Sequence, residues 1–243
     1  VAMPLFRRRG KERQPEVVVD PAGWIRRSVL INLDPVRLPG DLAVPPGAPA
    51  VVVFAHGSGS SRRSPRNVAV ARRLNEEGLG TLLFDLLTAE EGEDRSRVFD
   101  IELLARRLET TGRWVRRWPG LQDRQLAFFG ASTGAAAALV AAASMPSEVG
   151  AVVSRGGRPD LAGGALERVA APTLLIVGGD DVEVLELNRD AQRRLRCPTR
   201  LEVIPGATHL FEEPGALERV AELAASWASE GAREALGRVA GSG

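Results

Sequence analysis

Residues 128–139, Phe-Phe-Gly-Ala-Ser-Thr-Gly-Ala-Ala-Ala-Ala-Leu, join a short apolar run to an alanine-rich run through a turn with two glycines and a serine. The apolar run from Leu126 to Phe129 predicts a buried strand, and the alanines after Gly134 predict a helix packed closely on a sheet. Ser132 lies at the apex in the pattern Gly-x-Ser-x-Gly, which is typical of a nucleophile elbow. We expect its oxygen to stand above the sheet, in front of a helix N-terminus that stabilises negative charge.

The same five-residue pattern also arises by chance in a chain with 26 glycines. The alternative interpretation is an ordinary strand-to-helix turn without a catalytic role. The rest of the chain has to decide between the two.

Composition excludes several classes of protein. The 243 residues are 44% hydrophobic and 26% charged, with a net charge of +1, so nothing indicates nucleic acid or an anionic membrane as a partner. Cys197 is the single cysteine, which rules out an intrachain disulfide and argues against a cysteine metal site. No apolar run reaches the roughly 20 residues that a membrane span needs, and no signal peptide is recognised. We therefore expect a cytoplasmic protein without metal or cofactor.

Strands and helices alternate along most of the chain. Residues 25–33 and 36–44 predict an N-terminal antiparallel hairpin, the second strand being an edge strand with a bulge or bend at Pro39-Gly40. After residue 50, buried strands alternate with helices, except for an acidic loop over 89–95. This pattern predicts an α/β fold with a mostly parallel central sheet of about eight strands and helices on both faces.

The same pattern predicts how the chain divides. Residues 1–22 are expected to form an N-terminal arm, residues 23–230 one domain, and residues 231–243 a C-terminal tail. The stretch between Val153 and Thr173 is too short for a lid domain, so the site is expected to be relatively open.

Four loops that follow predicted strands carry the residues suited to chemistry. In such sheets these loops share one rim, where ligands bind. They hold both histidines of the chain, His56 and His209, as well as Ser132 and the pair Asp180-Asp181. A serine needs a base to take its proton, and a histidine base needs a carboxylate to fix its tautomer. The order serine, acid, histidine is that of α/β-hydrolases.

The acid of this set has two candidates. Asp181 is favoured, because it comes three residues after Gly178 at the end of a buried strand, and Asp180 is the fallback. The competing interpretation of Asp181 is an N-cap for the helix that begins near Val184.

Further candidates lie on the same rim. Backbone N–H groups of Ser58 and Thr133 are expected to form the oxyanion hole. His56 and Gly57 are candidate substrate contacts, with His56 shaping its loop by hydrogen bonding rather than acting as a base. Arg155 directly follows a strand and is the best candidate to meet an anionic group of the substrate. A phosphate loop at 56–61 is disfavoured, since the Gly-Lys-Ser/Thr ending is missing.

Residues from about 35 to 227 resemble a compact α/β-hydrolase of the dienelactone-hydrolase-like group. The stretches that carry the resemblance are VVVFAHGSGSS (51–61), TLLFDLL (81–87), FFGASTGAAAAL (128–139), PTLLIVGGDD (172–181) and IPGATHLFEEPGAL (204–217). The resemblance implies a Ser132–Asp181–His209 triad and hydrolysis of esters or related acyl compounds. Dienelactone hydrolases carry a cysteine nucleophile, and Ser132 in its place favours a serine carboxylesterase. Relatives with stretches like SRGGRPDLAG also occur fused to a phosphoribosyltransferase domain.

The expected function is therefore hydrolysis of small or short-acyl esters through an acyl-enzyme, with a small-molecule ester as substrate and neither nucleic acid nor membrane as a partner. Two alternatives use the same residues. One is a small-molecule binding protein that keeps the fold but does not convert a substrate. The other is an acyltransferase that passes the acyl group to an acceptor other than water.

Overall fold

A computed structural model describes residues 19–240, with side chains as far as residue 232. Most of the N-terminal arm predicted over 1–22 and the last three residues of the predicted tail lie outside this range. The strands are β1 (Ile25–Asn32), β2 (Arg37–Val44), β3 (Ala50–Ala55), β4 (Gly80–Phe84), β5 (Gln125–Ala131), β6 (Val149–Arg155), β7 (Thr173–Gly178) and β8 (Thr199–Ile204). The helices are α1 (Pro65–Glu76), α2 (Ala89–Glu93), α3 (Arg95–Val98), α4 (Ile101–Arg117), α5 (Thr133–Ser144), the 3₁₀ segment η1 (Pro159–Arg168), α6 (Val182–Arg194) and α7 (Ala216–Ala240).

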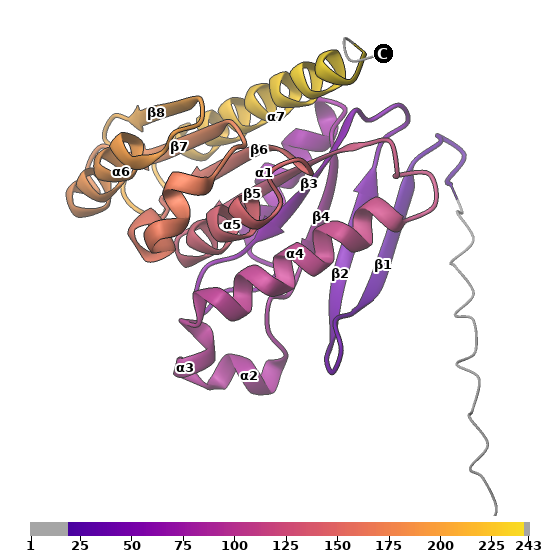
Figure 1. Cartoon of the computed structure of the whole chain (residues 1–243), viewed down its shortest axis with the longest axis horizontal. Coiled ribbons are helices and arrows are strands. Elements are labelled where there is room, and N and C mark those ends of the chain that lie inside the picture. The colour runs from indigo at the N-terminus through magenta and orange to yellow at the C-terminus, as the bar shows by residue number, and fades with distance from the viewer. Residues whose placement is uncertain (1–18, 241–243) are drawn as a thin grey trace, which may run out of the picture.

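The strands form one eight-stranded sheet in the order β1-β2-β4-β3-β5-β6-β7-β8. The pairs β1–β2 and β2–β4 are antiparallel, and all other neighbours are parallel. The predicted α/β fold with an N-terminal antiparallel hairpin is thus confirmed (Figure 1). Within the described residues, no helix is long and apolar enough to cross a membrane.

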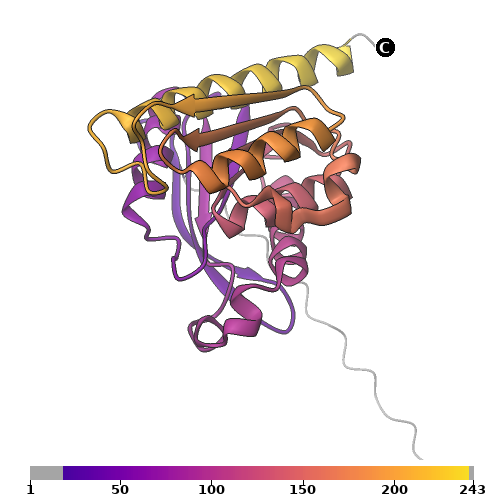
Figure 2. The ribbon, with the colours of Figure 1, turned by 90° about the vertical axis from the view of Figure 1, so that its left-hand side faces the viewer.

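Two helical layers cover the sheet, one on each face (Figure 2). On one face α1 and α7 pack together over Val52, Phe54 and Phe129. On the other face α4, α5 and η1 cover the opposite side chains of the same strands. All six residues of β3 are buried, as the continuous apolar run of a central parallel strand requires.

Three local predictions were wrong. β2 is not an edge strand, because β4 pairs with its other side, and its pairing with β1 runs through Pro39 and Gly40 without a bulge. Pro39 is tolerated because the β2–β4 register begins one residue later, at Gly40. Residues 89–95 are not a loop but hold α2 and the start of α3. The described part of the predicted C-terminal tail belongs to α7, which runs to Ala240.

The turn between β5 and α5 yields a prediction about stability. A Cβ on Gly134 would lie 2.2 Å from the carbonyl oxygen of Ala55, so Gly134→Ala has to displace either β3 or α5. We expect a loss of about 3 kcal/mol or more in the free energy of unfolding, measured by urea denaturation.

Gly92→Ala in α2 is the matched control, because a Cβ there meets nothing within 4 Å. This variant should be neutral or more stable by about 0.5–1 kcal/mol. Equal stabilities of the two variants would contradict the packing described for the turn.

Candidate active site

Ser132 occupies the turn between β5 and α5 in a conformation that side chains rarely adopt, with φ 52° and ψ −122°. Its N–H donates to Arg155 O (3.1 Å), and its own carbonyl accepts from the N–H groups of Ala135 and Arg158. A Cβ on Gly130 would lie 2.4 Å from the Cα of Ala135, so strand and helix touch at this glycine. These contacts hold Ser132 at the apex, as the sequence predicts.

Asp181 and His209 are brought together by the loops that follow β7 and β8. A Cβ on Gly178 would lie 2.3 Å from Ala207 O, so the two loops are in backbone contact. The N–H of Asp180 donates to the same Ala207 O (3.0 Å) and ties the loops together. Across this junction, Asp181 Oδ2 lies 2.7 Å from Nδ1 of His209. That carboxylate can orient the imidazole and stabilise its protonated form.

The geometry separates the interpretations of the acid. Asp181 is the N-cap residue of α6, yet its side chain makes no hydrogen bond to the helix. The carboxylate reaches His209 instead, which favours Asp181 over the fallback Asp180 as the orienting acid.

One short segment, residues 155–156, contacts both Ser132 and His209. Ser132 N–H bonds the carbonyl of Arg155, and a Cβ on the next residue, Gly156, would lie 3.5 Å from Cε1 of His209. Among the described residues, the Ser132 hydroxyl makes no hydrogen bond with the imidazole. In unliganded enzymes such catalytic bonds are often long and shorten when substrate binds.

The predicted oxyanion residues are in direct contact. Ser58 N–H donates to Oγ1 of Thr133 (2.9 Å), and Thr133 is the first residue of α5, where backbone N–H groups have no acceptor within the helix. Gly57 lies against the proposed nucleophile, because a Cβ on it would lie 3.1 Å from Cβ of Ser132. Both N–H groups therefore lie beside the serine.

His56 fixes the orientation of this loop. Leu86 N–H donates to Nε2 of His56 (3.0 Å), so that nitrogen is unprotonated, and the Nδ1–H donates to Gly57 O (3.0 Å). In a trans peptide the C=O and the following N–H point in opposite directions. By holding the carbonyl of Gly57, His56 directs the N–H of Ser58 away from itself. The side chain thus shapes the loop, which is the role that the sequence suggested.

A cleft of about 410 Å³ opens beside this loop. Residues of the loop form one wall, and the opposite wall comes from the segment after β4 and from α2, α3 and α4. Its apolar lining includes Leu86, Leu87, Ala89, Val98 and Leu104. No lysine or arginine is among the residues that line it.

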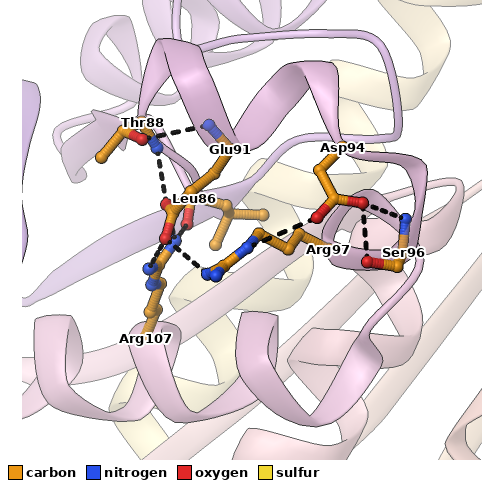
Figure 3. Close-up of polar contacts among 7 residues, drawn as sticks. All are labelled: Leu86, Thr88, Glu91, Asp94, Ser96, Arg97 and Arg107. Carbon is orange, nitrogen blue, oxygen red and sulfur yellow. Dashed lines mark hydrogen bonds and ion pairs between the residues drawn. The ribbon is translucent and has the colours of Figure 1, made fainter.

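The wall made by α2 and α3 is held by one nearly buried ion pair (Figure 3). Both ends of the Arg107 guanidinium bond the Glu91 carboxylate (2.7 and 2.8 Å), and Nη1 also donates to Leu86 O (2.8 Å). The hydrogen bond from Arg107 lowers the pKa of Glu91 to about 2. Glu91 also closes a capping box with Thr88 at the start of α2. The motif Thr-x-x-Glu was visible in the sequence, and it would have predicted this helix.

Arg155 does not line the cleft described above. It ends β6, and its side chain follows those of Ala151 and Val153 onto the face covered by α1 and α7. Only 8% of it is exposed, so its predicted role as a substrate contact remains a prediction.

Comparison with known proteins gives a consistent result. The model of the dienelactone hydrolase family matches residues 38–239. A crystal structure of dienelactone hydrolase from Anabaena variabilis superposes with a TM-score of 0.81 and 55% identity, covering 84% of this chain and 96% of that one. Est1E from Butyrivibrio proteoclasticus has a TM-score of 0.71, covering 84% of this chain and 98% of that one, but at 18% identity it shows the fold alone.

Two Mycobacterium tuberculosis proteins, each named "Putative phosphoribosyl transferase", are 59% identical over 199 residues. The match covers 82% of this chain but 45% of each relative. The chain therefore spans about half the length of these relatives.

The buried His56 should make the free energy of unfolding depend on pH in one range. Burial lowers its pKa below the usual 6.5, so the folded protein keeps the ring neutral where the unfolded chain would protonate it. Its contribution to stability is thus present above pH 6.5 and lost as the pH falls. We expect the free energy of unfolding of the wild type to decline below pH 6.5, and the decline to be smaller in His56→Leu.

Glu91 should make the free energy of unfolding depend on pH in a second, more acidic range. A carboxyl with a pKa of about 2, against 4.5 as the usual value, adds stability above pH 4.5 that is lost as the pH falls toward 2. Glu91→Gln should lower stability at neutral pH, because it leaves Arg107 buried without its counter-ion, and should flatten the profile between pH 4.5 and 2. Glu90→Gln, on the exposed side of α2, should leave the profile unchanged in urea titrations.

Proposed function

The chain belongs to the dienelactone hydrolase family, and on this premise we propose that it is a serine hydrolase that cleaves small carboxylic esters. The observation that carries the proposal is the 2.7 Å contact between Asp181 and His209 at the loop beside the strained turn of Ser132. A hydrogen-bonded acid and histidine next to a serine at a helix N-terminus are the parts that acyl transfer needs.

In this mechanism Ser132 Oγ attacks the ester carbonyl while His209 Nε2 takes its proton. Asp181 holds Nδ1–H of the ring and stabilises the imidazolium that forms. The tetrahedral intermediate collapses to an acyl-enzyme when the imidazolium protonates the departing alcohol. Water then repeats the sequence, with its proton passing to His209 and the acyl group leaving as a carboxylic acid.

The oxyanion of each tetrahedral intermediate would be held by the N–H groups of Thr133 and Ser58. In the free protein the Ser58 N–H is bound to Oγ1 of Thr133, so the substrate oxygen has to share or replace that acceptor. His56 is a positioning residue in this scheme, since its ring orients the Gly57–Ser58 peptide, and it also lines the cleft beside the loop.

The cleft of about 410 Å³ suggests what the ester carries. Leucine, valine and alanine side chains form its apolar part, polar groups that include Asp85 and Glu93 also line it, and it adjoins the proposed oxyanion loop at Ser58. We infer that it receives an apolar group of the acyl or alcohol part, since such pockets bind through burial of apolar surface.

The test is replacement of the proposed nucleophile. Ser132→Ala should lower turnover of 4-nitrophenyl esters by at least about 1,000-fold and abolish labelling by a fluorophosphonate probe. Ser144→Ala, at the other end of α5, is the matched control and should keep both. Retained turnover in the folded Ser132→Ala variant would contradict the proposal.

Labelling also separates the alternatives. A folded wild-type protein that neither labels nor hydrolyses any ester would favour the small-molecule binding protein. Labelling with product formed only when an alcohol acceptor is present would favour acyl transfer. A series of 4-nitrophenyl esters of rising acyl length would then measure how much apolar chain the cleft accepts.

A further inference from the structure

The guanidinium of Arg155 is a buried cation that has no counter-ion among the described residues. The residue is 8% exposed, its Nη1 is buried without a hydrogen-bond partner, and no carboxylate in the described part of the chain pairs with it. Burial lowers its pKa to about 10, which leaves it charged at neutral pH. Buried polar groups are almost always partnered, and an unpaired buried charge is strongly unfavourable. The position therefore lacks an anion.

A second arginine lies near Arg155. Arg66, in the first turn of α1, bonds Glu212, the residue after Phe211. A Cβ on Gly156, next to Arg155, would lie 3.3 Å from the ring of Phe211. The charge of Arg66 also lowers the pKa of Arg155. Nε of Arg66 is also buried and without a partner. Two neighbouring guanidinium groups, each with an unused N–H donor, repel one another unless an anion lies between them. Arginine donors in this arrangement suit carboxylate and phosphate oxygens.

The acids closest in sequence to His209 leave these donors free. Glu212 Oε1 bonds Nη1 of Arg66 (3.1 Å) at the surface, where the glutamate side chain is 65% exposed. Glu213 uses Oε1 to accept from the N–H and the hydroxyl of Thr208. Exposed ion pairs contribute little free energy, so another anion can displace Glu212 from Arg66.

This pair of arginines adjoins the proposed catalytic residues. The carbonyl of Arg155 accepts the N–H of Ser132, and the neighbouring Gly156 packs against His209. The side chain of Arg155 lies on the α1 and α7 face, whereas the apolar cleft is walled by α2, α3 and α4 on the opposite face. The apolar cleft and the two arginines thus lie on opposite faces of the sheet, at the end that carries Ser132.

We propose that Arg155 and Arg66 form an oxyanion subsite that binds a carboxylate or phosphate group of the substrate, which displaces Glu212 from Arg66. The assignment of the ligand as substrate rests on the proposed ester hydrolysis. The subsite itself rests on the buried N–H donors that have no partner, Nη1 of Arg155 and Nε of Arg66.

The first experiment compares esters that differ only in charge. 4-Nitrophenyl hexanoate and mono-4-nitrophenyl adipate place the charge on the acyl side, and phenyl acetate and 4-carboxyphenyl acetate place it on the alcohol side. For the preferred pair, Arg155→Met should lower the ratio of kcat/KM for the anionic ester to that for the neutral ester by about tenfold or more. Glu212→Gln should raise the same ratio, since it removes the internal competitor.

Arg63→Gln is the matched control, because Arg63 is an exposed arginine three residues before Arg66. It should leave the ratio unchanged. Arg66→Gln, at a partly exposed position, serves as a second test if Arg155→Met fails to fold, and it should lower the ratio in the same direction.

The second experiment needs no catalysis. Sodium phosphate or sodium acetate, at constant ionic strength set with NaCl, should raise the Tm of the wild type and not that of Arg155→Met. The anion that gives the larger rise in Tm identifies phosphate or carboxylate as the preferred group. If no ester is hydrolysed but this shift is seen, the proposed function fails and the subsite stands.

Two results would overturn the inference. The first result is that Arg155→Met and Arg66→Gln change neither the kcat/KM ratio of anionic to neutral ester nor the effect of anions on the Tm. In that case water alone satisfies the two arginines. The second result is that anions raise the Tm of the wild type while the kcat/KM ratio of anionic to neutral ester is the same in every variant. In that case the site binds a free anion and takes no part in substrate selection.

Discussion

The close approach of α5 to the end of β3 is the constraint on which the rest of the site depends. Gly134 leaves no space for a Cβ against Ala55 O, so the helix begins directly above the middle of the sheet. Ser132 is therefore forced into a strained turn, and the N-terminus of α5 lies beside the loop that contains Gly57 and Ser58. The strain is tolerated because buried alanines anchor α5 along most of its length.

A second close backbone contact, at Gly178, positions the acid and the histidine. At Gly178 the loops after β7 and β8 touch through their backbones, and this contact places Asp181 against His209. Phe211, two residues beyond the histidine, is buried in the layer of α1 and α7 and holds the histidine loop down. Rigid sheet ends and small residues thus position each polar group, which preorganised catalysis requires.

The surroundings of Ser132 differ on its two sides. On one side, α2 and α3 wall an aliphatic cleft, and the Glu91–Arg107 pair fixes that wall with both charges satisfied. On the other side, Arg155 is buried and pairs with no carboxylate of the described residues. The contrast is informative, because the chain compensates one buried arginine fully and leaves the other uncompensated. This asymmetry is the physical basis for proposing a substrate with an apolar part and an anionic part.

The order of strands and helices and the loops that hold Ser132, Asp181 and His209 follow from the sequence alone. Short continuous apolar runs that end at glycine-rich turns predict buried strands, and the longer alanine-rich run after Gly134 predicts a helix. The sequence also contained the Thr88–Glu91 capping box, a local signal that predicts α2. Tertiary structure alone decided that β2 lies inside the sheet, that Arg107 meets Glu91, that Ser58 bonds Thr133, and that Arg155 is buried. Each of these depends on contacts between residues far apart in the chain, where neither periodicity nor turn chemistry carries information.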